Sequence, residues 1–249
     1  MSEGVRVIPL RGLPELSTGD DLAGLLAAAA AGGGGLEAGD VVVVAQKAVS
    51  KVEGRIVSLD DVEPGEQARE LAGADGDPRR IEIVLREARA VVRSRPPLVI
   101  AETHHGFVCA SAGVDASNAN GPDTLVLLPL DPDASAARLR ERLHELTGVA
   151  PGVVVSDSFG RAWRQGTTDV ALGVAGIVAL RDLRGVRDSA GYELSSTQIA
   201  VADEIAGAAE LVMGKTSGVP AAIVRGLDLA GDGTGLDLVM PRERDLFRD

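Results

Sequence analysis

The sequence predicts an α+β fold with mixed sheets, and three observations support this. Short runs rich in Val and Ile alternate along the chain with longer stretches of helical period, so both strands and helices are expected. Two predicted strands, at residues 107–114 and 124–129, follow each other with no helix between them, which breaks the strand–helix alternation of a parallel sheet. Aromatic residues make up only 2% of the chain, so Ala, Val, Leu and Ile must fill the core.

The predicted strands are short, Val-rich apolar runs. The clearest is the four-valine run after Asp40, which is expected to be buried. In chain order, strands are expected at residues 5–9, 40–45, 98–102, 107–114, 124–129, 153–156 and 221–225.

The predicted helices are clearest where a capping residue precedes an apolar stripe. Asp77 can cap a helix at residues 78–93. Ser135 can cap a second helix at residues 136–147, which Gly148 would end. Further helices are expected at residues 21–31, 65–72 and 198–213.

Charge and cysteine content exclude several classes of protein. The chain has 25 Lys and Arg against 37 Asp and Glu, and its net charge of −12 repels phosphate backbones, so no nucleic-acid partner is expected. A phosphorylated ligand would need a local concentration of donors, together with a metal ion. Cys109 is the only cysteine, which excludes an internal disulfide and a cysteine-based zinc site.

No targeting or membrane segment is recognisable. The first ten residues lack the basic stretch and the long apolar region of a signal peptide. The longest apolar run, residues 170–180, is too short and too interrupted by Gly to span a bilayer. We therefore expect no membrane partner and a cytoplasmic location. Residues 1–249 are expected to form one domain, with two interleaved subdomains as the alternative.

Rare polar residue types gather in four segments of the chain. Only three lysines occur beside 22 arginines, and Asn occurs only twice, at Asn118 and Asn120. A sequence that uses Arg for most cations has kept Lys where a compact ammonium differs from a guanidinium. Composition bias and small numbers are the alternative explanation. The segments are residues 46–51, 104–120, 157–168 and 213–220.

The first segment follows the four-valine strand directly. Gln46, Lys47, Ser50 and Lys51 stand where a buried strand ends, a position from which a sheet can present ammonium groups to a phosphate. Two surface lysines after a strand would give the same pattern, so this signal is weak alone.

Candidate metal ligands follow two separate apolar runs. Asp115 lies just past one predicted strand, and Asp157 with the hydroxyl of Ser158 lies past another. Carboxylate and hydroxyl oxygens suit Mg²⁺ or Mn²⁺. Each Asp could instead cap a turn.

A polar loop is expected at residues 157–168, and it contains the only tryptophan, Trp163. Arg161 and Arg164 could clamp a substrate carboxylate or phosphate through paired hydrogen bonds. An ordinary polar surface loop is the alternative. His104 and His105 show no catalytic or metal-binding spacing, and we do not expect either to act as a catalyst.

The last segment superficially resembles a Walker A motif. Met213 to Thr216 reads MGKT, but a Walker A motif needs Gly six positions before its Lys, and residue 209 is Ala. The preceding segment is also predicted to be a helix rather than a strand. A nucleotide held by Lys215 and its neighbours would therefore be bound by a loop that is not a P-loop.

Several strings together resemble one known family over nearly the whole chain. They are IPLRGLPEL, QKAVSKVEGR, HHGFVCASAGVDASN, VSDSFGRAWRQGTTDVALG and ELVMGKTSGVP followed by AIVRG. GVDASN and SDSFGR in this order and at this separation are specific. The chain resembles the coenzyme F420:L-glutamate ligase family, whose members build the γ-glutamyl tail of a deazaflavin coenzyme.

The resemblance implies a ligase with its own fold, unrelated to P-loop proteins, arranged as an intertwined homodimer. It implies that GTP phosphorylates the terminal carboxylate of the precursor F420-0 and that L-glutamate then attacks the acyl phosphate, giving an amide, GDP and phosphate. It also implies Mn²⁺ or Mg²⁺, with two ions expected, and K⁺.

The resemblance also implies roles for particular residues. Asp115, Asp157 and Ser158 are expected to bind the divalent metal, and Lys51 and Arg161 are expected to act in catalysis. One departure is Lys215, which stands where the family suggests a metal-contacting amide, so either the second metal site is altered or the ammonium replaces part of its charge. The nucleotide is expected to contact Pro9, Leu10, Arg11, Gly12, Gln46, Lys51, Asn118, Met213, Gly214, Lys215, Thr216, Ser217, Gly218, Val219 and Pro220.

Some family members carry a fused flavin-dependent reductase domain, so the chain is either free-standing, with the reductase as a separate partner, or part of a longer protein. Two other functions remain open on sequence alone. A metal-dependent phosphatase or nucleotide hydrolase could use the same carboxylates, and a non-catalytic nucleotide- or deazaflavin-binding module would need no chemistry.

Overall fold

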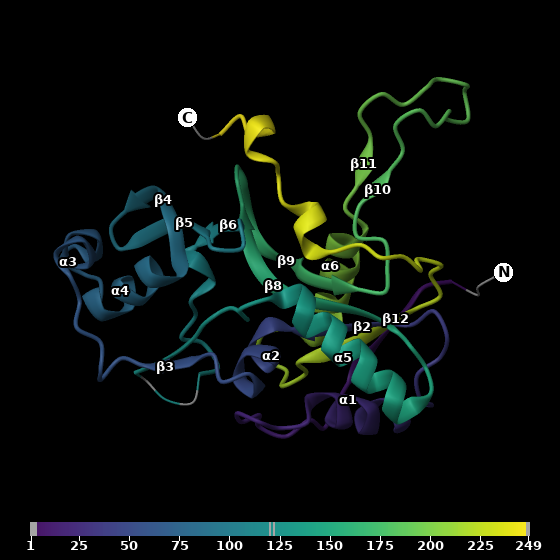
Figure 1. The fold of residues 1–249 in the computed structure, drawn as a ribbon, viewed down its shortest axis with the longest axis horizontal. Helices are drawn as coiled ribbons and strands as arrows, with labels where there is room; N and C mark the ends of the chain where they lie inside the picture. Colours follow the sequence, from purple (N-terminus) through teal and green to yellow (C-terminus); the bar gives the residue numbers. More distant parts are fainter. Residues whose placement is uncertain (1–3, 120, 122, 248–249) are drawn as a thin grey trace.

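A five-stranded mixed sheet forms the centre of the molecule (Figure 1), in a computed structural model that describes residues 4–119, 121 and 123–247. Only β2 and β8 pair in parallel, and the other neighbours in the sheet are antiparallel. The predicted α+β class with mixed sheets is confirmed. In spatial order the strands are β1 (Arg6–Leu10), β12 (Ala221–Arg225), β2 (Val41–Ala45), β8 (Gly152–Arg161) and β9 (Arg164–Ala175).

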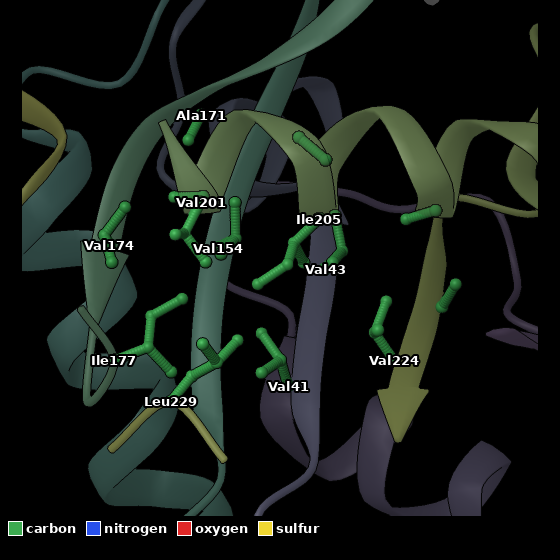
Figure 2. Close-up of a cluster of buried hydrophobic side chains, with 14 of the residues drawn as sticks. Val41, Val43, Val154, Ala171, Val174, Ile177, Val201, Ile205, Val224 and Leu229 are labelled. Carbon is green, nitrogen blue, oxygen red and sulfur yellow. The ribbon is translucent and has the colours of Figure 1, made fainter. Parts of the chain in front are cut away.

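Helices cover both faces of this sheet, so the valines of β2 are buried on both sides. Val41 and Val43 pack with α6 (Val201–Met213) on one face, as Figure 2 shows. Val42 and Val44 pack on the opposite face. The helices there are α1 (Leu22–Ala31), α2 (Gln46–Val52) and α5 (Pro132–Thr147). The strand is therefore apolar at each of these positions because neither face meets water.

A smaller lobe lies between α2 and α5 in the sequence and at the left of Figure 1. It has its own apolar core, which includes Ile81, Val84, Val99 and Leu125. Its helices are α3 (Glu66–Ala72) and α4 (Pro78–Glu87). Its strands are β4 (Ala88–Arg95), β5 (Leu98–Thr103) and β6 (Val108–Ala110) in one sheet, and β3 (Ile56–Ser58) paired with β7 (Thr124–Val126).

A long arm leaves the body between β9 and α6 and carries the short strands β10 (Arg181–Asp182) and β11 (Gln198–Ile199). The remaining regular elements are 3₁₀ turns: η1 (Ser111–Gly113), η2 (Gly235–Leu238) and η3 (Arg242–Arg244). Among the helices of the described residues, none is both long enough and apolar enough to cross a membrane.

Several predicted boundaries were wrong, chiefly because strand pairing decides what local periodicity leaves ambiguous. The helix predicted at 78–93 ends at Glu87, and its second half is β4, which pairs with β5. The second helix begins at Pro132, because the Asp131 side chain rather than Ser135 caps it by accepting from the Ala134 amide at 2.9 Å. The helix predicted from residue 198 begins at Val201, since residues 198–199 pair with β10.

Several further elements were absent from the sequence prediction, among them the short strands β3, β10 and β11. Residues 46–52 form helix α2 directly after β2. Residues 157–168, expected to be a loop, instead form the outer part of a β-hairpin between β8 and β9, whose register pairs Ser158 with Asp169.

One buried ion pair ties the start of β2 to the end of β12. The Asp40 side chain, fully buried, accepts from Nε and Nη2 of Arg225, each at 2.7 Å, and from the amide of Glu37 at 2.8 Å. The hydrogen bonds that Arg225 donates to Asp40 raise the pKa of Arg225.

We expect Asp40→Ala to lower the free energy of unfolding by about 3–5 kcal/mol, because it leaves a buried guanidinium without its main partner. Urea unfolding followed by circular dichroism measures this loss. Glu145→Ala is the control, since Glu145 pairs with Arg142 at the surface, where such pairs contribute about 0.5 kcal/mol or less. Equal losses in the two variants would contradict the expected role of Asp40.

Candidate functional site

A cavity of about 400 Å³ opens where β2 ends beside β8. All three lysines of the chain, Lys47, Lys51 and Lys215, line it, although they lie far apart in the sequence. Four carboxylates line it as well, those of Glu15, Asp157, Asp169 and Glu210. The cavity therefore concentrates the rare ammonium groups beside acidic residues.

The register of the parallel pair β2–β8 explains why these groups meet. Ala45 pairs with Ser156, so the residues that follow these two positions lie at the same edge of the sheet. On β2 they are Gln46 and Lys47, which begin helix α2, and on β8 they are Asp157 and Ser158. Two segments that sequence analysis singled out separately are thus side by side.

The Asp115 segment reaches the same place from the smaller lobe. Three successive residues, Ser111 to Gly113, have φ between 50° and 73°, a left-handed turn that costs roughly 1–2 kcal/mol at each non-glycine residue. Asp115 then pairs with Val126 through backbone hydrogen bonds of 3.0 and 2.8 Å. This turn directs Asp115 to the cavity edge, where its carboxylate lies 2.7 Å from Nζ of Lys47.

Lys51 and Gln46 are buried at the cavity wall. The side chain of Lys51 is 8% exposed, and its ammonium pairs with Glu15, whose own side chain is largely exposed. Oε1 of Gln46 accepts from the Ser50 hydroxyl at 2.9 Å. Nε2 of Gln46 is buried and has no hydrogen-bond partner within the residues described. A buried donor without a partner is costly, so Gln46 fits a ligand oxygen in this cavity.

Asp157, which is half-buried, and Asp169, which is buried, lie near each other on the hairpin. The pKa of Asp157 is raised to about 7, chiefly by desolvation. The carboxylates of Asp169 and Asp115 contribute to this rise, whereas the Ser158 amide and Lys47 oppose it. Asp169 accepts from the hydroxyl of Ser158 at 2.6 Å and from that of Ser156 at 3.0 Å. Since Ser158 donates its proton to Asp169, the lone pairs of its oxygen remain available to a cation.

The loop after α6 closes the cavity on its third side. Nδ2 of Asn118 donates to the backbone carbonyl oxygen of Lys215 at 3.5 Å, and this hydrogen bond links the loop to the Asp115 segment. Of the predicted nucleotide contacts, those that line the cavity are Gln46, Lys51, Asn118, Met213, Gly214, Lys215, Thr216, Gly218, Val219 and Pro220.

Comparisons with known proteins agree with this geometry. The model of the F420-0:gamma-glutamyl ligase family matches residues 12–226. The chain is 45% identical to the coenzyme F420:L-glutamate ligase of Methanopyrus kandleri and 44% identical to that of Methanothermobacter thermautotrophicus, with 98% or more of each chain covered. The ligase of the same name from Methanocaldococcus jannaschii is 43% identical over 86% of each chain.

The chain belongs to the F420-0:gamma-glutamyl ligase family.

Some predicted site residues of this family member lie away from the cavity. Pro9, Leu10, Arg11 and Gly12 and also Ser217 are not among the residues that line it, and the N-terminal segment contributes Leu13 to Leu16 instead. Arg161 lies near the tip of the β8–β9 hairpin, exposed and beyond the cavity lining.

The two histidines lie away from the cavity. His104 and His105 contact backbone carbonyl oxygens of Arg86 and Pro129, and neither lines the cavity. Asn120 lies outside the described residues.

Sequence analysis missed Asp169 and Glu15 as cavity residues. Asp169 follows two threonines and precedes an apolar run, and nothing local distinguishes it from a surface residue. Only the hairpin register, which places it opposite Ser158, brings it to the site. A predicted hairpin at residues 152–175 would have been the signal that could find it.

The cavity of this ligase family member fits a divalent cation only with help from a ligand. Within the described residues, no group of three or more His, Cys, Asp or Glu side chains is placed to hold a metal ion. Asp157, the Ser158 hydroxyl and the nearby Asp115 nevertheless offer the hard oxygen donors that Mg²⁺ or Mn²⁺ prefers. Phosphate oxygens commonly complete such a shell.

We expect Mn²⁺ affinity to fall about tenfold per pH unit below pH 7, because the pKa of Asp157 is raised to about 7 and a proton then competes with the ion. Above pH 7 the carboxylate is ionised and affinity should level off. Calorimetric titration with Mn²⁺ at pH 6 and pH 8 measures the difference. Asp157→Asn should bind weakly at both values, and equal wild-type affinities would contradict this role.

Proposed function

We propose that the chain is a GTP-dependent ligase that adds L-glutamate through γ-linked amide bonds to the deazaflavin coenzyme precursor F420-0. One observation carries the proposal: a chain of net charge −12 places all three of its lysines around one cavity. The names of its relatives supply the reaction, since they are coenzyme F420:L-glutamate ligases.

The cavity supports binding of nucleotide phosphates. Lys51, Lys47 and Lys215 are point charges at its wall, and the buried Gln46 amide is an unused donor. The ammonium groups of Lys51 and Lys47 pair with Glu15 and Asp115. A triphosphate would replace these carboxylates as the partner of the lysines.

Charge balance supports divalent cations as well. Three lysines cannot neutralise a triphosphate and the acidic residues of the same cavity. Asp115, Asp157 and Ser158 would hold Mn²⁺ or Mg²⁺, which when bound neutralises charge on the phosphates during transfer. Lys215 replaces part of the charge at a second metal position. K⁺ as an activator rests on the family alone.

The chain's residues mainly bind and position the reactants. The carboxylate oxygen of F420-0 attacks the γ-phosphorus of GTP, and the bond from that phosphorus to the β–γ bridging oxygen breaks to release GDP. The amine of glutamate then attacks the acyl phosphate, an amide bond forms, and phosphate and a proton leave. Arg161 is proposed to act on the acceptor. No nucleophilic side chain is required, and burial raises the pKa of the Cys109 thiol to about 12, which keeps it protonated.

Glutamate-dependent release of GDP tests this function. We expect mass spectrometry of F420-0 incubated with GTP, Mn²⁺ and L-glutamate to show products heavier by whole glutamyl units. A phosphatase or nucleotide hydrolase would release phosphate without glutamate, and a binding module would release none. Either of those results would refute the ligase proposal.

A homodimer is also proposed, and a light-scattering mass near 25.5 kDa would contradict it.

We expect Lys51→Arg to lower kcat/KM for GTP at least tenfold, about 1.4 kcal/mol of barrier, although it keeps the charge. The buried pocket fits a compact ammonium, and a longer planar guanidinium cannot occupy the same position. Steady-state kinetics and the thermal midpoint measure both effects. Arg142→Lys, at an exposed position, is the matched control and should change neither. Unchanged kinetics in Lys51→Arg would remove Lys51 from the phosphate site.

A further inference from the structure

The only tryptophan of the chain is largely exposed at the tip of the β8–β9 hairpin. Trp163 is 82% exposed, in a chain with just 2% aromatic residues. Its φ of 57° lies in the left-handed region, which is unfavourable for a bulky residue. Neither the core nor the cavity described above uses this ring. A strained, exposed aromatic side chain on a rigid hairpin points to a contact with a ligand.

The hairpin connects this ring to the candidate site. Ser158 and Asp169 pair across the hairpin at the cavity, and Arg161 pairs with Arg164 at its tip. Arg161 lies three positions after Ser158 along the strand, a distance of about 10 Å at roughly 3.3 Å per residue. A ligand that reacts in the cavity could therefore reach the tip if it is elongated.

The charge at the tip favours an anionic ligand. Arg161 and Arg164 flank the turn, and both are exposed. In the described part of the chain neither arginine forms an ion pair, so both guanidinium groups are available to a ligand. Two free guanidinium groups beside a flat ring suit a molecule with both an aromatic system and an anionic tail.

One face of the ring has a neighbour. Phe247 lies with its centroid 5.0 Å from that of Trp163, tilted by 51°, so the C-terminal segment packs beside the hairpin tip (Figure 1). Trp163 remains largely exposed despite this contact, so it retains surface for a second ring. Anchoring of the C-terminal segment is the alternative role for Trp163.

We propose that Trp163, with Arg161 and Arg164, binds the deazaflavin ring and the adjoining anionic tail of the acceptor substrate. This inference rests on the proposed ligase function, which requires the acceptor's terminal carboxylate to lie in the cavity. The flat ring then stacks on Trp163 at the hairpin tip, and the arginines pair with the tail between the two points. Trp163 is thus a residue of acceptor recognition and takes no part in the chemistry.

Calorimetric titration of the full chain with F420-0 tests the proposal. Trp163→Ala should raise the Kd for F420-0 about tenfold or more, because stacking on an aromatic side chain is lost. Trp163→Phe keeps a ring and should stay within about threefold of wild type. Tyr192→Ala, which removes another exposed aromatic ring, is the matched control and should leave the Kd unchanged. KM for GTP should not change in any of these variants.

A deazaflavin without the anionic tail separates the two parts of the subsite. Trp163→Ala should weaken its binding by the same factor, whereas Arg161→Gln should weaken only F420-0. If Trp163→Ala leaves the Kd for F420-0 unchanged while the wild-type protein turns over F420-0, the subsite proposal is overturned and the ligase proposal stands. A lowered thermal midpoint with that unchanged Kd would assign Trp163 to anchoring the C-terminal segment. Wild-type protein that neither binds nor consumes F420-0 would overturn the ligase proposal and the subsite with it.

Discussion

The parallel pairing of β2 with β8 is the constraint on which the candidate site depends. Every other neighbour in the central sheet is antiparallel, and this one pair brings two strand segments to the same edge. Parallel strands need a long connection, and here the connection is the whole smaller lobe together with α5. The lobe that makes the parallel pairing possible also supplies Asp115, which pairs with Lys47 of the cavity lining.

The site contains side chains and backbone conformations that lower the stability of the fold. Desolvation, with a smaller contribution from Asp169, raises the pKa of Asp157, and Nε2 of Gln46 is buried without a partner among the described residues. Ser111 and Ala112 adopt left-handed backbone angles just before Asp115. Each feature costs stability, and the buried valines on both faces of β2 offset that cost. A cation and an anion bound together would relieve the electrostatic part of it.

Sequence reasoning singled out the cavity lysines because lysine is scarce in the chain. It missed residues that reach the cavity only through strand pairing. The scarcity of lysine singled out Lys47, Lys51 and Lys215, and the fold brings them to one cavity. Asp169 gave no signal, because its role depends on lying opposite Ser158 in the hairpin. The helix predicted at residues 78–93 failed for the same reason: Val91 and its neighbours suit a helix or a strand, and pairing with β5 decides between them.

Two contacts make the cavity sensitive to the position of the smaller lobe. The Lys47–Asp115 ion pair joins the lobe to α2, and the Asn118 amide meets the loop after α6 at the 3.5 Å limit of a hydrogen bond. Both contacts involve residues proposed to bind metal or nucleotide. A ligand that draws Lys47 toward phosphate and Asp115 toward a cation replaces a direct lobe-to-body contact with one through the ligand. Ligand binding and the position of the smaller lobe would therefore be coupled through the same few charges.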